Sequence, residues 1–435
     1  MYSIVKKIPF HLIIAATTLL SKAIVLIVQI WGTKYFISRL NLNDYSSFVL
    51  LSAIAPWMLL SDLGIGSAAQ NFISELRGRN QNGSKYIFYA LALSSLFILV
   101  FFPVFLFLAP TLTQFYLQPQ DASSLVKETG AFRIALLIFL LFSLGAVTQK
   151  LWLALQKGWV GNLFPAIGSI LSVILLNLSI FDEAKSQLSG ALVIFYAPTA
   201  IAYLISIILL LPRIKSIKLT RGIFLTDVAE LIKRSGSFWF FSLMASFVLQ
   251  ADYIVLSQKF QAEEVLIYSI HQRIFSIIFF VYVAVLQALW PTCAEMRIAG
   301  RWQELKHTAW VHILFGILGV LLYTSIIFIF RSPVMAFFSS AVVPSFVLIM
   351  AFGVLNVIRV WTDTFAMMLQ SMNVLKPLWV IVPLQATLTL ALQFVFSDYF
   401  GLVGIVFGLI AGYVLTAALF CPLIFLKKIR YEQMV

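Results

Sequence analysis

The sequence predicts an all-α membrane protein with twelve transmembrane helices, arranged as two six-helix bundles around a central cavity. Three observations support this fold class. The 435-residue chain is 61% hydrophobic and only 11% charged, whereas a soluble domain carries about 25% charged residues. Its apolar residues form long runs separated by short gaps. Short motifs in the first half of the chain recur in the second half.

Twelve apolar runs are each long enough to cross a hydrocarbon core at about 1.5 Å of rise per residue. In chain order they cover residues 10–33, 45–66, 86–110, 130–155, 162–181, 190–211, 237–258, 265–291, 308–330, 343–370, 377–396 and 401–426. The first run follows Lys6 and Lys7 as in a signal sequence, but it is longer and has no small-residue cleavage site. We therefore expect a retained helix.

The distribution of positive charge predicts the orientation. Of the 30 Lys and Arg residues, the six in gaps assigned to the outer side are Lys34, Arg39, Lys127, Lys185, Lys259 and Arg331. The four inside spans are Lys22, Arg133, Arg273 and Arg359. All others lie on the opposite side, so the positive-inside rule places both termini in the cytoplasm. Orientation thus explains the net charge of +13, and no nucleic-acid partner is expected because the cations form no continuous soluble face.

The longest inner gap divides the chain into six and six spans. It predicts an N-terminal six-helix bundle over residues 1–212, a cytoplasmic amphipathic linker helix over 213–236 and a C-terminal six-helix bundle over 237–435. The linker is expected to lie on the inner leaflet, with Thr226 or Asp227 as its N-cap. Its simplest role is to connect the bundles; docking of a partner is the alternative.

The two halves resemble copies of one another. Ser74-Glu75-Leu76-Arg77 follows span two, and Ala294-Glu295-Met296-Arg297 follows span eight. Because each copy has an even number of spans, both copies have the same topology and are expected to be related by an axis along the membrane normal. Such an arrangement places a cavity between the bundles.

Three spans each carry a cation on a polar stripe. In span ten, Asn356, Arg359 and Asp363 follow at steps of three and four and share one helix face. Similar stripes occur in spans one and eight. A central charge facing lipid costs about 2.5 to 3.5 kcal/mol on the insertion scale, so the stripes should face water. The candidate substrate-binding residues are Lys22, Gln29, Arg273, Gln287, Asn356 and Arg359.

The four intramembrane cations outnumber two carboxylates, Asp252 and Asp363. The cavity is therefore expected to favour an anion, and Arg together with Lys suits phosphate. Asp252 and Asp363 are candidates for ion coupling. Simpler readings remain open: Arg359 and Asp363 as a structural i,i+4 pair, Asp252 as a bond to a neighbouring helix, and Arg133 as a snorkelling side chain.

No catalytic motif stands out. The glycines of Asp62-Leu63-Gly64-Ile65-Gly66 predict the end or bend of a helix, with a hinge as the alternative. The chain contains no P-loop, HExxH, CxxC or GxSxG motif. We expect no catalytic residue, metal site or cofactor, and Cys293 and Cys421 are interpreted as unpaired thiols.

Several segments together carry a family resemblance. They are the Asp62–Ala68 pattern before a cytoplasmic turn with Glu75, Ala251-Asp252-Tyr253, Tyr268-Ser269-Ile270, and Leu289-Trp290-Pro291 leading to Ala294-Glu295. With the six-plus-six layout, they resemble the O-antigen (Wzx-type) flippases of the polysaccharide transporter family. That family belongs to the multidrug/oligosaccharidyl-lipid/polysaccharide exporter superfamily. The resemblance runs the length of the chain.

The resemblance implies a transporter rather than an enzyme. Its cargo would be an undecaprenyl-diphosphate-linked O-antigen oligosaccharide, moved from the cytoplasmic to the periplasmic leaflet of the bacterial inner membrane by alternating access. A proton or Na+ is implied as coupling ion, with membrane lipids and an O-antigen polymerase complex as further partners. Because the family has no agreed set of cavity residues, the resemblance assigns no residue roles.

Two other functions remain as alternatives. A multidrug exporter of the same fold would use a more acidic or apolar cavity for cationic drugs, and the excess of intramembrane cations argues against it. An O-antigen polymerase would carry a large periplasmic loop with catalytic arginines. The longest outer gap, Thr111 to Thr129, holds a single Lys and no Arg.

Overall fold

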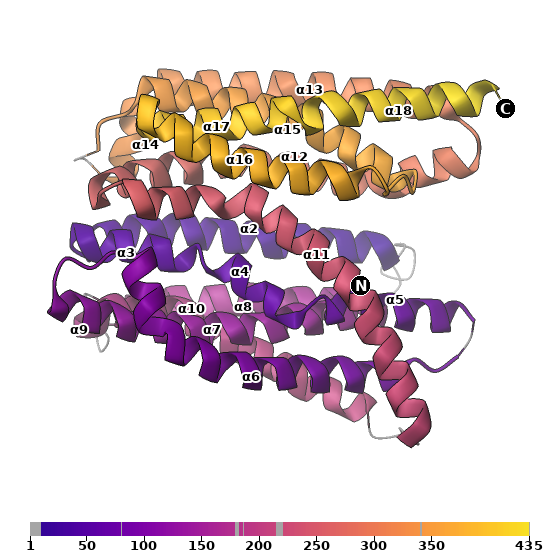
Figure 1. Cartoon of the computed structure of the whole chain (residues 1–435), viewed down its shortest axis with the longest axis horizontal. Coiled ribbons are helices and arrows are strands. Elements are labelled where there is room, and N and C mark those ends of the chain that lie inside the picture. Colours follow the sequence, from indigo (N-terminus) through magenta and orange to yellow (C-terminus); the bar gives the residue numbers. More distant parts are fainter. Residues whose placement is uncertain are drawn as a thin grey trace, which may run out of the picture. The chain divides into compact units, whose positions relative to one another are not determined.

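The protein is all-helical in the part of the chain that its computed structural model describes, residues 10–79, 81–178, 182–185, 187–214, 221–339 and 342–434 (Figure 1). Twelve helical segments within these residues are long and apolar enough to span a membrane. They follow the twelve predicted spans in order, which confirms the fold class. The chain divides into two compact units, Met1–Leu243 and Met244–Val435.

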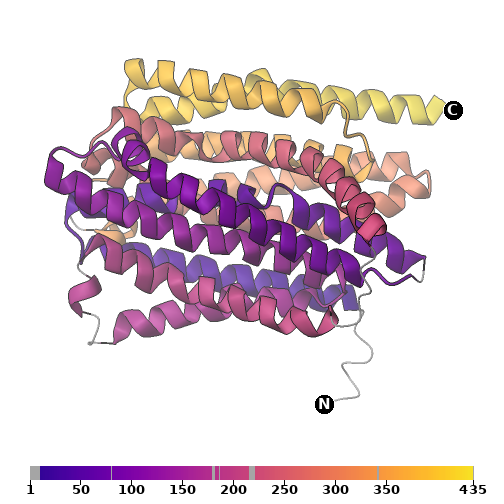
Figure 2. The same cartoon turned by 60° about the horizontal axis from the view of Figure 1, so that its bottom comes forward.

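The first unit consists of long helices that run side by side, with short helices at their ends (Figure 1, Figure 2). Its elements are α2 (Phe10–Ile37), α3 (Leu42–Ser52), α4 (Ala55–Leu59), the 3-10 turn η1 (Leu60–Asp62), α5 (Ile65–Gly78), α6 (Ser84–Tyr116), α7 (Ala122–Ala154), α8 (Gly158–Asn177), α9 (Asp182–Lys185), α10 (Leu188–Leu210) and η3 (Leu211–Arg213). The first part of α11 (Arg221–Lys259) completes this unit.

The second unit takes the remainder of α11 and the helices that follow it. These are α12 (Ala262–Ile298), α13 (Trp302–Ile329), α14 (Arg331–Phe338), α15 (Phe346–Ser371), α16 (Leu378–Phe400), α17 (Leu402–Leu415) and α18 (Ala417–Met434). Here α16 and α17 approach closely, since a Cβ on Gly408 would lie 2.5 Å from the Cα of Gln393. Helices in membranes commonly pack through small residues in this way.

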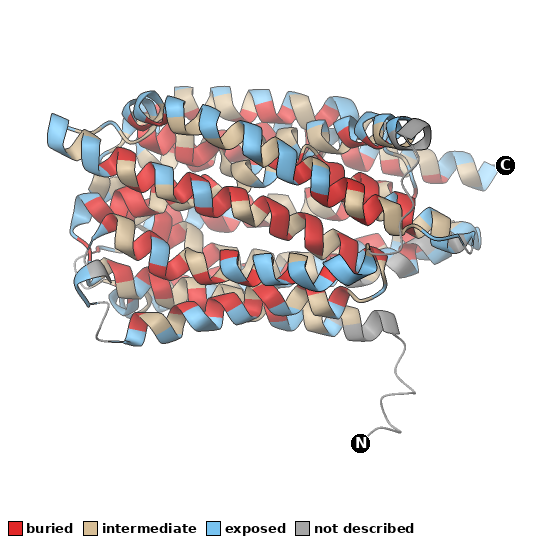
Figure 3. Cartoon of the chain, turned by 90° about the horizontal axis from the view of Figure 1, so that it is seen from below, coloured by how far each residue is buried: buried red, intermediate tan, exposed pale blue. Residues whose placement is uncertain are grey.

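The outward faces of the helices are apolar, and polar side chains lie inside. Figure 3 shows buried and exposed residues along the same long helices. Phe107 on α6 is 84% exposed, whereas Ser94 on the same helix is fully buried. On α13, Leu322 is exposed and Thr324 is buried. Exposed apolar and buried polar side chains are expected where hydrocarbon is the surrounding solvent.

The predicted outer gap from Thr111 to Thr129 is mostly helical, because the helices on both sides extend into it. Helix α6 continues to Tyr116 and α7 begins at Ala122. A capping box starts α7: Asp121 Oδ1 accepts from the Ser124 amide at 2.7 Å, and Ser124 Oγ accepts from the Asp121 amide at 3.1 Å. The box satisfies free amide groups of the first turn. Helix therefore begins before the apolar run does.

The predicted linker helix is the first part of α11, and it packs on the first unit. Leu231 is fully buried in a core that includes residues of α5, α6 and α7. Arg234 lies over the Phe72 ring at 4.0 Å and donates to Glu75 Oε1 at 2.9 Å. Leu231 on the apolar face of the linker thus covers the protein core, and the placement of this helix on the inner leaflet stays a prediction.

The predicted N-cap of this helix was wrong. Helix α11 begins at Arg221, ahead of both Thr226 and Asp227. The carboxylate of Asp227 instead pairs with Lys85 Nζ on α6 at 2.6 Å. An acidic side chain near a helix start thus serves a contact between helices here.

The Asp62–Gly66 segment ends one helix and begins another, as predicted. Leu63 and Gly64 both adopt left-handed backbone conformations, with φ of 47° and 76°. Asp62 stabilises this turn by accepting from the Gly64 amide at 2.8 Å, and its carboxylate lies 3.5 Å from Lys150 Nζ. A Cβ on Gly64 would lie 2.5 Å from the carbonyl oxygen of Ser235, so the turn is in close contact with α11.

Candidate functional site

A carboxylate with three hydrogen bonds lies buried in the second unit. Asp252 on α11 is 3% exposed. Its Oδ2 accepts from the Tyr268 hydroxyl at 2.8 Å and from Gln272 Nε2 at 3.0 Å, and its Oδ1 accepts from the Tyr253 amide at 3.0 Å. Tyr268 and Gln272 are four residues apart on α12 and so share one helix face. This face of α12 is directed at Asp252.

The tight α11–α12 hairpin brings these groups together. Lys259 ends α11 and Ala262 begins α12. The first turn of α12 is capped by Glu264, whose Oε2 accepts from the Gln261 amide at 2.9 Å. The Tyr253 hydroxyl also donates to Gln272 Oε1. The carboxylate, two tyrosines and one amide side chain thus form a single hydrogen-bond network.

Aromatic rings link this network to α15. Tyr268 lies 5.5 Å from the Phe352 ring centre, and Phe275 stacks on Phe352 at 5.6 Å. Rings at these separations pack favourably and exclude water. Helix α15 carries Arg359 two turns beyond Phe352.

Arg359 rests on an aromatic ring beside a carboxylate. Its guanidinium carbon lies 3.3 Å from the centre of the Phe279 ring, which belongs to α12. Its Nε lies 3.9 Å from Asp363 Oδ2, the i,i+4 ion pair that the spacing predicted. This distance is long for a charge-assisted hydrogen bond. Nε is buried and has no hydrogen-bond partner among the described residues.

The network and the guanidinium act on each other electrostatically. Arg359 exerts a Coulomb attraction on both Asp252 and Asp363. One cation therefore serves two carboxylates in this part of the unit. The second unit thus holds Arg359, whose Nε has no hydrogen-bond partner among the described residues, and the hydrogen-bonded carboxylate of Asp252. Aromatic side chains pack beside both groups.

The other predicted residues are more widely distributed. Asn356 is buried and donates to the Phe352 carbonyl of its own helix at 2.9 Å. Arg273 is half-buried on α12, and Gln287 is exposed farther along the same helix. In the first unit, α2 carries an exposed Lys22 and a half-buried Gln29. That these five residues bind substrate stays a prediction.

Sequence reasoning missed Gln272 and Phe279, although both contact predicted residues. The spacing of Gln272 from Tyr268 was a usable signal, since it puts two polar groups on one face. Phe279 stands in a run of apolar residues and offers no such signal. Within the described ranges, no group of three or more His, Cys, Asp or Glu side chains is placed to hold a metal ion.

Comparison with curated proteins finds relatives over nearly the whole chain, although no protein-family model matches it. A Salmonella typhi protein named as an O-antigen transporter is 35% identical over 97% of both chains. A Salmonella typhimurium protein of the same name is 34% identical over 97% of this chain and 98% of its own. A Yersinia pseudotuberculosis protein named as an O-antigen export protein is 33% identical over 96% of each.

Solved structures of similar fold are transporters. An inward-facing MATE multidrug resistance transporter of the MOP superfamily matches with a TM-score of 0.76 at 14% identity, over 94% of this chain and 95% of its own. A MOP-superfamily transporter from Pyrococcus furiosus, described as having a binding pocket of reverse polarity, matches with a TM-score of 0.68 at 15% identity, over 97% and 96%. At this identity the likeness concerns the fold.

Proposed function

The chain belongs to the O-antigen transporter family, and from this premise we propose that it is a flippase for undecaprenyl-diphosphate-linked O-antigen oligosaccharide. The cargo moves from the cytoplasmic to the periplasmic leaflet of the bacterial inner membrane, and both termini of the protein lie in the cytoplasm. The observation that carries the proposal is the similarity to O-antigen transporters over 97% of the chain. An O-antigen polymerase is the proposed partner that receives the cargo.

The diphosphate of the cargo is proposed to bind Arg359. Stacking on Phe279 fixes the plane of the guanidinium, while the long separation from Asp363 leaves its donors incompletely used. A planar guanidinium binds phosphate oxygens in a bidentate manner. Lys22 adds a second positive charge. Gln29, Arg273, Gln287 and Asn356 are proposed as further contacts to the cargo.

Alternating access is proposed to move the predicted bundles, residues 1–212 and 237–435, with respect to each other. The linker over residues 213–236 would move with the first of them. Two contacts support this assignment, namely Arg234 with Glu75 and Asp227 with Lys85. In this proposal the linker is attached to the first bundle by these contacts and does not act as a flexible connection.

Export is expected to fail when the two cations are removed together. Loss of about 2 kcal/mol of charge-assisted binding at each site corresponds to roughly 30-fold per site. The variant Lys22→Ala/Arg359→Ala should insert into the membrane normally while lipid-linked glycan accumulates in the cytoplasmic leaflet. The measurement is surface O-antigen, together with the leaflet distribution of the lipid-linked form, in a deletion strain carrying the variant.

Normal surface glycan in that strain contradicts the proposal. The matched control is Lys34→Ala, which removes an exposed cation near the end of α2 and should export normally. Drug susceptibility of the deletion strain separates the flippase from a multidrug exporter. We expect it to equal that of the parent strain.

Asp252 and Asp363 are proposed to couple transport to a proton or Na+. Replacing Asp252 with Asn removes the one titrating carboxyl of the α11–α12 network and keeps its shape. Transport by Asp252→Asn should therefore lose part of its dependence on pH, measured as glycan export between about pH 5.5 and 8.5. Asp398→Asn, which alters an exposed carboxylate, should keep the wild-type profile. If Asp252→Asn also keeps it, Asp252 has no part in coupling.

A further inference from the structure

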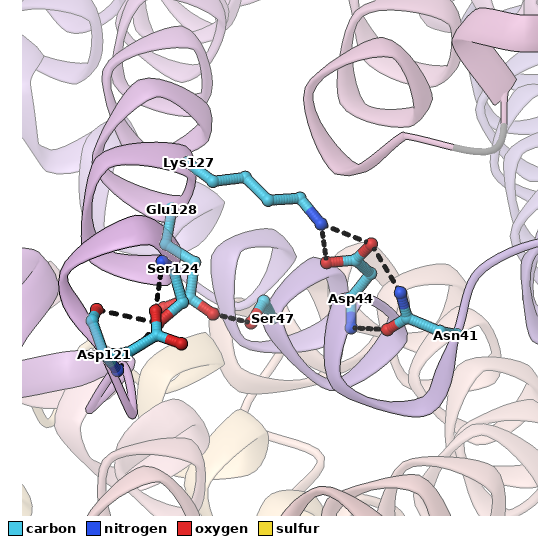
Figure 4. A network of polar contacts seen from close by, with 7 residues as sticks. All are labelled: Asn41, Asp44, Ser47, Asp121, Ser124, Lys127 and Glu128. Carbon is cyan, nitrogen blue, oxygen red and sulfur yellow. Dashed lines mark hydrogen bonds and ion pairs between the residues drawn. The ribbon is translucent and has the colours of Figure 1, made fainter.

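A further buried carboxylate, that of Glu128, lies in the first unit, where α3 contacts α7 (Figure 4). Glu128 on α7 is 9% exposed. Its Oε1 accepts from the Ser47 hydroxyl on α3 at 3.1 Å. Its Oε2 is buried and has no hydrogen-bond partner in the part of the chain that the structure describes. None of the contacts proposed for the cargo involves this residue.

The cation beside Glu128 is committed to another carboxylate. Lys127 Nζ lies 2.6 Å from Asp44 Oδ1 and 2.7 Å from Asp44 Oδ2. Asn41 Nδ2 donates to Asp44 Oδ2 at 3.0 Å, which holds Asp44 in place. In Figure 4 the Lys127 side chain reaches Asp44 while the Glu128 carboxyl is turned to Ser47.

Two neighbouring carboxylates are thus accompanied by one ammonium group, which contacts only Asp44 of the two. The charges that act on Glu128 are the negative Asp44 on α3 and the positive Lys127 on its own helix. If Glu128 is ionised, the cluster carries a net negative charge in a buried place. An uncompensated buried charge costs several kcal/mol. One additional positive charge at Oε2 would balance the cluster.

We propose that Glu128 is a proton-binding site. A proton from water adds to Oε2 and converts the carboxylate to a neutral carboxyl group, and the same proton returns to water when the site empties. The geometry favours a proton over a metal cation. A metal ion needs several oxygen ligands around it, whereas Oε2 has no polar neighbour within hydrogen-bonding distance in the described residues. A proton needs only the one oxygen.

Proton binding is expected to tighten the contact between α3 and α7. When no proton is bound, the negative charges of Glu128 and Asp44 repel each other across this contact. Protonation of Glu128 removes this repulsion. Asp44 and Glu128 both lie in the first two turns of their helices, at the end that the charge distribution assigns to the periplasm. This consequence for transport rests on the proposed function, but the proton site itself does not.

Infrared difference spectroscopy on the purified full-length protein in nanodiscs tests the site without any cargo. Glu128 is the one buried glutamate among the described residues, so a protonated glutamate signal at pH 7 would come from it. We expect a carboxyl C=O band at pH 7 that shifts when glutamate is 13C-labelled and that disappears in Glu128→Gln. The 13C label separates this band from those of Asp252 and Asp363.

Three results overturn the proposal: no labelled band at pH 7, a band that persists in Glu128→Gln, or a band that Na+ removes at constant pH. The control Glu304→Gln alters an exposed glutamate paired with Arg301 and should keep the band. If Glu128→Gln does not fold, Ser47→Ala provides the second test. Loss of the donor to Oε1 should shift the band, and an unshifted band counts against the site.

The transport consequence is tested separately. Glu128→Gln should export glycan with a flatter pH profile than the wild type. If the infrared band is assigned to Glu128 and the profile is unchanged, the coupling role is wrong and the proton site stands. Export of no O-antigen by the wild type itself would contradict the proposed function instead.

Discussion

Gly64→Ala is expected to destabilise the first unit by about 2 to 6 kcal/mol. Gly64 has φ of 76°, which costs an L-residue with a side chain about 1 to 3 kcal/mol. The added Cβ would also lie 2.5 Å from the Ser235 carbonyl oxygen and 2.8 Å from the Trp239 amide nitrogen. Because these are backbone atoms, α11 must shift, at a further cost of about 1 to 3 kcal/mol. Thermal unfolding of the purified protein and its yield in membranes measure the effect.

The matched control is Gly319→Ala on α13. A Cβ there would meet no atom within 4 Å, and Ala favours a helix interior over Gly by up to about 1 kcal/mol. The control should be as stable as the wild type or more so. A Gly64→Ala variant with wild-type stability would mean that α11 does not pack on the Asp62–Gly66 turn.

Arg359→Gln is expected to reduce export by roughly 30-fold, from the loss of about 2 kcal/mol of charge-assisted binding. The substitution also leaves Asp363 without its cation, so some loss of stability is expected. The double variant Arg359→Gln/Asp363→Asn removes both charges and should recover most of that stability. It should not recover export, because the anion-binding group is still missing. Surface O-antigen and thermal unfolding are measured on the same variants.

This pair of variants decides between the two readings of Arg359. If the pair is purely structural, the double variant restores export along with stability. Phe279→Leu provides an intermediate case, since it removes a cation–π contact of about 1 to 2 kcal/mol and keeps the charge. Its export should lie between those of the wild type and Arg359→Gln. Export equal to wild type in Phe279→Leu would indicate that the ring does not position the guanidinium.

The fold was predictable because membrane spans depend mainly on composition. In hydrocarbon, a single run of apolar residues can hydrogen-bond all of its backbone N–H and C=O groups only as a helix. Each predicted span was therefore expected to be helical. Helix ends follow a different rule. Asp121 and Ser124 begin α7 by capping free amide groups, and hydropathy does not detect that signal. The start of α11 before Asp227 was missed for a related reason, since the charge of Asp227 is used in a contact with α6.

The candidate site was predictable only within single helices. The spacing of Arg359 and Asp363 put them on one face, and the structure pairs them. The contacts of Asp252 with α12 depend on how two helices are rotated with respect to each other, which periodicity does not determine. Glu128 was missed because it lies in the outer gap between two predicted spans, where a charged residue is expected to face water. Its place in a helix makes its burial significant.

The course of α11 bears on how the protein is assembled during synthesis. One uninterrupted helix supplies Leu231 to the core of the first unit and Asp252 to the network of the second. A ribosome that has released only residues 1–212 has not yet made the side chains that close the first core. The core of the first unit therefore remains incomplete until the next span has been synthesised. Two separate fragments divided at residue 212 would have to associate before the first could complete its core.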